Sequence, residues 1–168
     1  SSGYGSGSSS VSLKNLTLTR NFAAYGPGGG INTDSFISAD SITVTGNSAK
    51  PPAASGGGGW NQASLANSII SGNKSTDGDG DDLGNFDPDT NPYNERPAGN
   101  LYLSFSLVGD TGSVQIKTAA PGSNFIGATN PGLRPLADNG GPTMTRLPKP
   151  SSAAVNEGAS ELTTDQRV

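Results

Sequence analysis

Cysteine and histidine are both absent from this 168-residue chain. Without cysteine the chain cannot form disulfide bonds, act through a thiol or build most structural zinc sites. Without histidine it cannot carry a Ser-His-Asp triad or a histidine-ligated metal. These two absences exclude several common classes of enzyme and metal site before any pattern in the sequence is considered.

Apolar and charged residues are both scarce, at 31% and 14%, and aromatic residues make up only 6%. Globular domains usually contain roughly 45–50% apolar residues, and disordered chains are usually rich in charge. Glycine (25 residues) and proline (12 residues) are abundant. Such a chain must rely on backbone hydrogen bonds and polar ladders, which favours a single all-β domain with many turns.

The net charge is −4, and no basic run alternates with aromatic residues, so we expect no nucleic-acid partner. No apolar run reaches the roughly 20 residues of a membrane helix, so no membrane-spanning segment is expected either. Residues 1–12, SSGYGSGSSSVS, form a low-complexity segment without an initiating methionine or a signal peptide. We expect the chain to be a mature product or a piece of something longer.

An internal repeat is visible in the first half of the chain. Asn21, Asn47 and Asn73 lie 26 residues apart, and each closes a similar phrase: LKNLTLTRN, ADSITVTGN and LANSIISGN. Apolar and hydroxyl side chains alternate within these phrases, as in a half-buried strand. The predicted core comprises Leu16, Leu18, Ile31, Ile42, Val44, Trp60, Leu65 and Ile70.

Two positions of this repeat are ambiguous. Ser68 occupies an inward slot that the other copies fill with Leu or Ile, and a shift of one residue would place Ile69 there instead. The glycine-rich phrases GGGIN and GGGGWN place Ile31 and Trp60 at like positions. Trp60 is therefore predicted to lie in the core, and a platform for stacking a sugar ring is the alternative.

A repeat of two short strands and two corners cannot bury its own inner face, so neighbouring repeats must stack. We predict a right-handed parallel β-helix with about 26 residues per coil. In this fold the three asparagines would form a structural ladder, each amide bonding to the next coil. The alternatives are an antiparallel sandwich and three unrelated left-handed turns.

The predicted solenoid covers residues 13–128. A loop without periodicity and with three prolines interrupts it at 84–99. A further coil resumes at 100–110, where Leu101, Leu103, Phe105 and Leu107 alternate, and the last short strands fall at 113–118 and 124–128. Residues 129–168 are expected to be an irregular C-terminal cap over the open end of the stack, which would otherwise be an unpaired sheet edge.

Two stretches resemble known families. The phrases NFAAYGPGGGIN and VTGNSAKPPAASGGGGW resemble the repeat of polymorphic outer-membrane proteins. The run from 135 to 168, with LADNGGPT and TDQR, resembles the terminal segment of secreted bacterial β-helix proteins with a choice-of-anchor Q domain. Ala153 and Asn156 depart from that pattern, where proline and aspartate are usual. The resemblance implies a secreted or surface-displayed right-handed β-solenoid and supplies no catalytic residues.

The most acidic stretch, NKSTDGDGDDL, follows the third asparagine. Asp77, Asp79, Asp81 and Asp82 offer the hard oxygen ligands that calcium prefers. The spacing partly matches an EF-hand loop and a calcium-binding solenoid nonapeptide, but no Glu lies at the twelfth position from Asp77. These acids are either a calcium site or a solvated turn that follows the ladder residue, and we expect no other cofactor.

These patterns predict a non-enzymatic extracellular β-solenoid with a structural or adhesive role at a microbial surface. Its expected partners are copies of itself, in a filament, or other surface components, including glycans. The alternative is a β-helix that binds or cleaves polysaccharide, because β-helix enzymes use carboxylates, or calcium with a basic residue, on one exposed face. Outward threonines also suggest ice binding, but Ile69 interrupts the row formed by Thr17 and Thr43.

Overall fold

The computed structural model describes residues 10–25, 28–33, 35–50, 58–60, 62–75, 82–83, 100–112, 114–118, 122–159, 162 and 166. Within these ranges every regular element is a β-strand, and every pair of strands is parallel. The prediction of an all-β, parallel fold is therefore confirmed, and the antiparallel sandwich is wrong. None of these residues forms a helix long and apolar enough to cross a membrane.

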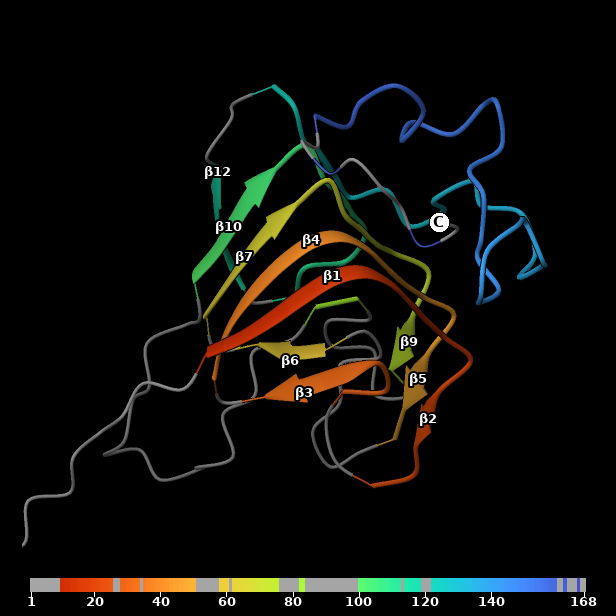
Figure 1. The fold of residues 1–168 in the computed structure, drawn as a ribbon. Helices are drawn as coiled ribbons and strands as arrows, with labels where there is room; N and C mark the ends of the chain where they lie inside the picture. Colours follow the sequence, from red (N-terminus) through yellow and green to blue (C-terminus); the bar gives the residue numbers. More distant parts are fainter. Residues whose placement is uncertain are drawn as a thin grey trace, which may run out of the picture.

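The largest sheet has eight strands and curls around the interior (Figure 1). Its order is β12-β10-β7-β4-β8-β11-β13, with β1 on the other edge of β4. The strands are β1 (Ser10–Thr19), β4 (Phe36–Thr45), β7 (Gln62–Ala66), β8 (Ile69–Ile70), β10 (Asn100–Ser104), β11 (Leu107–Val108), β12 (Gln115–Thr118) and β13 (Phe125–Ile126).

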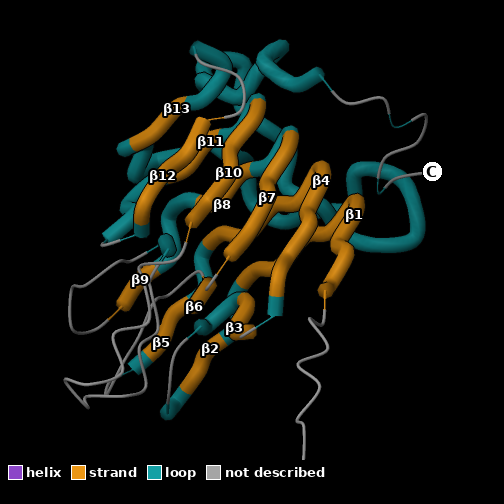
Figure 2. The backbone as a smooth tube through the Cα atoms, turned by 90° about the vertical axis from the view of Figure 1, so that its left-hand side faces the viewer, coloured by secondary structure: helices purple, strands orange, loops and turns teal. Residues whose placement is uncertain are grey.

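Two smaller sheets complete the wall around the interior, as Figures 1 and 2 show. One has the order β2-β5-β9, and the other pairs β3 with β6. Their strands are β2 (Phe22–Ala23), β5 (Ser48–Ala49), β9 (Lys74–Ser75), β3 (Ile31–Thr33) and β6 (Gly58–Trp60). The chain thus contributes a strand to each sheet in turn before it returns to the first.

The repeat seen in the sequence sets the strand register. Leu16 pairs with Ile42 and Thr43 pairs with Ile69, both at a separation of 26 residues. The same step joins β2, β5 and β9. The later steps differ, because Gln62 pairs with Asn100, 38 residues on. The 26-residue step therefore holds from β1 through β4 to β7 and β8, and from β2 through β5 to β9. Strands β3 and β6 pair at a step of 27 residues, because Ile31 pairs with Gly58. The predicted loop at 84–99 lies outside the described residues.

Residues in the left-handed backbone region bend the large sheet at one corner. Four such residues have φ between 49° and 57°: Asn15, Ser41, Asn67 and Phe105. Each lies in the middle of the segment that its coil contributes to the large sheet. A single left-handed residue turns the strand direction and interrupts the alternation of faces. These residues lie at equivalent positions of neighbouring coils and therefore form a continuous bend.

The core lies inside the curled sheet. Ile42, Val44, Leu65 and Ile70, which the sequence predicted as core, are fully buried. The remaining predicted core residues differ: Leu16, Leu18 and Ile31 are partly buried and pack against this cluster. Nothing is described of the Trp60 side chain.

Three details of the register differ from the sequence interpretation. Ile31 pairs with Gly58 rather than lying at the level of Trp60, which pairs with Thr33. The similarity of the two glycine phrases predicted that Ile31 and Trp60 are equivalent. The backbone pairing instead places Ile31 beside Gly58, two residues before Trp60. No one-residue shift occurs in the third coil, because Ile69 pairs with Thr43 and Ser68 remains inside.

Two further expectations need correction. Phe105 does not continue the inward row of Leu101 and Leu103, because its left-handed backbone directs the ring outward, where it is 36% exposed. Strand β1 begins at Ser10, inside the low-complexity N-terminal segment predicted for residues 1–12, because residues 10–14 pair with 36–40 of the next coil.

The C-terminal segment, 129–159, contains no strand and only two isolated antiparallel bridges, Leu133 with Pro148 and Ala137 with Thr145. The Ala159 amide donates to the Asn67 side chain at 2.6 Å, and Thr17 donates to Gln166 at 2.7 Å. These contacts span the first three coils, so the segment runs back along the side of the sheet.

Candidate functional site

The three predicted ladder asparagines lie one above another at a corner between the large sheet and the β2-β5-β9 sheet. The backbone N–H and the side-chain Nδ2 of Asn21 both donate to Oδ1 of Asn47, at 3.0 and 2.9 Å. Asn47 donates to Oδ1 of Asn73 through the same two groups, at 3.0 and 2.9 Å. The amide oxygens of Asn47 and Asn73 therefore each accept two hydrogen bonds from the preceding coil.

A buried aspartate ends this ladder. Asn73 donates its backbone N–H and its Nδ2 to Oδ1 of Asp82, both at 2.8 Å. The other carboxylate oxygen of Asp82 accepts from the Asp110 backbone N–H at 2.9 Å. Asp82 thus takes the place of a fourth asparagine and joins the third coil to the strand row that follows the 84–99 loop.

This placement bears on the proposed calcium site. Asp82 is only 2% exposed, and both of its oxygens accept hydrogen bonds from the chain. Asp77, Asp79 and Asp81 lie outside the described residues. Among the residues that the structure does describe, no cluster of three or more acidic side chains could hold a metal. Asp82 therefore acts as the structural end of the ladder.

Burial and hydrogen bonding oppose each other at Asp82. Burial raises the pKa of its carboxyl group and dominates, while the N–H donors of Asn73 and Asp110 lower it. At Arg146, in the C-terminal segment, burial and the nearby positive charge of Arg20 both disfavour the charged form and lower the pKa.

The raised pKa of Asp82 predicts a specific pH dependence of stability. From its ordinary pKa of about 3.9 up to its raised value, the folded chain holds a proton that the unfolded chain has released. The free energy of unfolding contributed by Asp82 is therefore highest below this window and falls as pH rises through it. We expect this fall in wild type relative to Asp82→Asn, which does not titrate. Urea unfolding of both proteins across this window measures it, and a relative gain with rising pH would contradict it.

A second row of polar groups lies at the bend of the large sheet. The Ile42 backbone N–H donates to the Ser68 hydroxyl at 3.3 Å, and the Ser68 N–H donates to the Ser106 hydroxyl at 3.2 Å. The Ser106 N–H then donates to Oδ1 of Asn124 at 3.0 Å. Ser68, the residue that broke the apolar pattern, therefore satisfies backbone groups that the bend leaves unpaired.

The outer face of the large sheet is covered beyond this bend. Val44, Ile70 and Val108 face the core, so their neighbours Ile69 and Leu107 face outward. Leu107 is nevertheless only 2% exposed. The C-terminal segment covers this outer face, and Ser71 donates a hydrogen bond to the Ala128 carbonyl where the segment begins.

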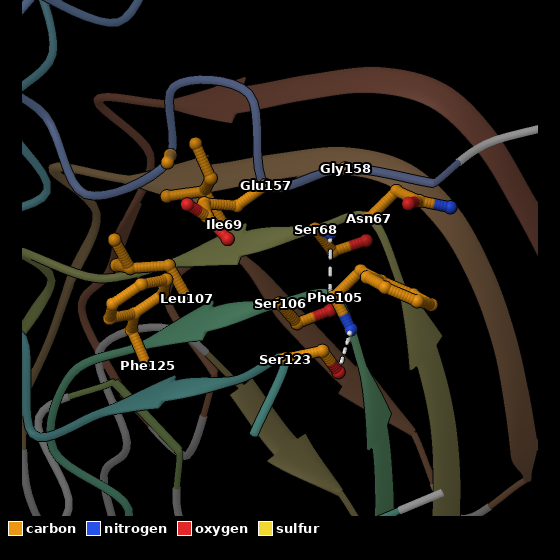
Figure 3. A pocket seen from close by; sticks show the side chains of 11 residues that line it. Asn67, Ser68, Ile69, Phe105, Ser106, Leu107, Ser123, Phe125, Glu157 and Gly158 are labelled. Atoms are coloured by element: carbon orange, nitrogen blue, oxygen red, sulfur yellow. Dashed lines mark hydrogen bonds between the residues drawn. The ribbon is translucent and has the colours of Figure 1, made fainter. Parts of the chain in front are cut away.

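A small cleft of about 70 Å³ remains between the sheet and the C-terminal segment (Figure 3). Ile69 and Leu107 form its apolar floor, and Phe105 and Phe125 lie beside them. Glu157 on the C-terminal segment lies over Ile69. Aromatic rings beside a carboxylate can contact the faces and hydroxyl groups of a small polar ligand.

Because the C-terminal segment covers only part of the outer face, truncating two outward residues of the same row should lower the free energy of unfolding by different amounts. Leu107→Ala should lower the free energy of unfolding by about 2–3 kcal/mol, because it leaves a cavity beneath the C-terminal segment. Thr43→Ala, in the same row but only half-buried, should cost less than about 1 kcal/mol. Urea unfolding measures both values, and a similar small cost at both positions would show that the C-terminal segment does not cover Leu107.

A wider cleft of about 430 Å³ opens beside the end of the ladder. Lys74, Asp110, Thr111 and Thr129 contribute polar groups to it. Asp110 Oδ1 accepts from the Gly112 backbone N–H at 3.0 Å, so part of its hydrogen-bonding capacity is used within its own turn.

No protein-family model, curated protein or solved structure matches this chain. Function must therefore be inferred from its geometry.

Sequence reasoning did not find the buried Asp82, the Ser68–Ser106–Asn124 row or the covered outer face. The third of these left a signal, because the pairs Ile69–Ile70 and Leu107–Val108 are consecutive apolar residues. Such pairs are typical of strands that are buried on both faces.

Proposed function

We propose that this chain is a right-handed parallel β-helix that serves as a non-enzymatic structural or adhesive element on the outside of a microbial cell. The observation that carries the proposal is the asparagine ladder closed by Asp82. In this ladder, polar side chains at a regular 26-residue spacing hold the first three coils together. A rod with this internal support presents a rigid, regular surface to its surroundings.

The composition supports an exterior location. The chain is stabilised without cysteine, so its fold does not depend on redox conditions. Its sequence is poor in charged residues and rich in Ser, Thr and Asn. The resemblance of residues 135–168 to secreted β-helix proteins points in the same direction.

A second candidate function is polysaccharide binding, which the cleft under the C-terminal segment favours. Phe105 and Phe125 are both partly exposed there, beside Glu157. Stacking of a sugar ring on an aromatic face, with a carboxylate accepting hydrogen bonds from its hydroxyl groups, would suit these side chains. This candidate predicts that Phe125→Ala abolishes retention on a polysaccharide column.

Negative-stain electron microscopy of the purified chain, with and without a calcium chelator, tests the structural role. We expect separate rods whose shape does not change with chelator, because the ladder is closed by protein groups. Loss of the rods on chelation would assign the acids at 77–81 to a calcium site instead. Release of new reducing ends from an acidic polysaccharide would contradict the non-enzymatic role.

A further inference from the structure

Strand β1 leaves one edge of the large sheet open. It pairs with β4 along one side, and no strand within the described ranges pairs with the other side. Leu16 and Leu18 are only partly buried, whereas their partners Ile42 and Val44 are 1% and 0% exposed. The inner apolar row of the first coil is thus less covered than the same row one coil further in.

The ladder is open at the same end. Oδ1 of Asn47 and of Asn73 each accepts two hydrogen bonds from the preceding coil. The side chain of Asn21 only donates, since no described residue donates to its Oδ1, and Asn21 is exposed. The open acceptor has a defined geometry, because the ladder fixes where a matching amide would lie.

We propose that the open edge of β1 binds a parallel β-strand of another polypeptide, which carries an asparagine above Asn21. The partner strand presents apolar residues above Leu16 and Leu18, and its asparagine donates a backbone N–H and a side-chain amide to Oδ1 of Asn21. This interface continues the established β1–β4 pairing by one step. The inference rests on the proposed structural role, and it names the partner of that scaffold by its chemistry.

A second copy of this chain does not supply these groups at its other end. Val108 pairs with both Ile70 and Ile126, so Ile126 in the last coil is equivalent to Ile70. Asn73 follows Ile70 by three residues, and the residue at the same offset from Ile126 is Thr129. Threonine has no side-chain amide, and the Thr129 backbone N–H already donates to the Gly127 carbonyl. A head-to-tail copy would therefore leave the Asn21 acceptor without its two donors.

A peptide with the sequence of residues 36–49, FISADSITVTGNSA, is a suitable probe, because it carries the repeat's apolar alternation and its asparagine. We expect saturable one-to-one binding of the fluorescently labelled peptide to the full chain. The same peptide with leucine in place of its asparagine should bind about tenfold more weakly, because the side-chain amide donor to Oδ1 of Asn21 is lost while the backbone N–H remains. Asn21→Leu in the protein should cause a similar loss, and Asn130→Leu, in the C-terminal segment, should not.

Three results would overturn the inference. One is the absence of binding by the asparagine peptide, and another is equal binding by the leucine peptide, which needs no variant of the protein. The third is self-association of the chain alone that Asn21→Leu abolishes, because it would assign the edge to a second copy. Failure of peptide binding with intact rods in the microscope would leave the structural role standing, whereas polysaccharide cleavage would remove that role whatever the peptide does.

Discussion

Replacing Asn47 with leucine is expected to lower the free energy of unfolding by about 4 kcal/mol, because it breaks the ladder at its most buried point. Asn47 is 1% exposed, and its Oδ1 accepts two hydrogen bonds from Asn21. Its Nδ2 donates to Oδ1 of Asn73 and to the Leu18 carbonyl, at 2.9 and 3.0 Å. Leucine has a similar volume but leaves these groups unpaired, at about 1–3 kcal/mol for each one that stays buried.

Asn21→Leu is the matched control for this experiment. It removes one side-chain donor from the exposed end of the same ladder, while the Asn21 backbone N–H still donates to Asn47. We expect a cost of about 1 kcal/mol. The midpoints of urea unfolding, followed by circular dichroism at neutral pH, give both values. Equal costs at the two positions would show that the ladder contributes no more in the interior than at its end.

The positions of the ladder could be predicted because a stacked coil repeats its geometry at a fixed step. Asn21, Asn47 and Asn73 follow that step. Asp82 does not, since it lies only nine residues after Asn73 and reaches the ladder from a different part of its coil. The next coil begins late, because Gln62 pairs with Asn100. A spacing search cannot find a residue that replaces a missing repeat, and neither interpretation of the acidic stretch placed Asp82 in the interior.

Alternation of apolar residues describes only one face of a strand, and this limited the prediction of the core. Val44 and Ile70 were found because they face inward. Leu107 was assigned to the inward row with Leu103, although the left-handed bend at Phe105 reverses the faces between them. Leu107 is buried from the outside, by a C-terminal segment that has no periodicity of its own. Contacts between an irregular segment and a sheet leave no repeat in the sequence to detect.

The glycine phrases misled the alignment for a related reason. Glycine carries no side chain, so a run of glycines contains no information about which residue pairs with which. Ile31 and Trp60 looked equivalent from their neighbours, yet Ile31 pairs with Gly58. Register is set by the flanking strands and their hydrogen bonds.

The second large effect is expected at Gly109, beside the carboxylate that ends the ladder. A Cβ atom at this position would overlap Oδ2 of Asp82 and lie 3.0 Å from its Cγ and 3.1 Å from the Ser71 hydroxyl. The backbone of Gly109 is not in the left-handed region, so alanine is excluded by contact rather than by φ. Gly109→Ala should therefore lower the free energy of unfolding by about 3 kcal/mol, as overpacking of a buried site does.

A double-mutant cycle identifies the cause. Asp82→Ala alone is destabilising, because it leaves the N–H groups of Asn73 and Asp110 without their acceptor. In that background Gly109→Ala should cost only about 1 kcal/mol, since the carboxylate that it would overlap is gone. Gly158→Ala is the control: its Cβ would lie 3.6 Å from the Asn67 side chain, an ordinary contact, and should change stability by less than about 0.5 kcal/mol. If the losses in the free energy of unfolding caused by Gly109→Ala and Asp82→Ala were additive, the Asp82 carboxylate would not lie beside Gly109. Its place at the end of the ladder would then be wrong.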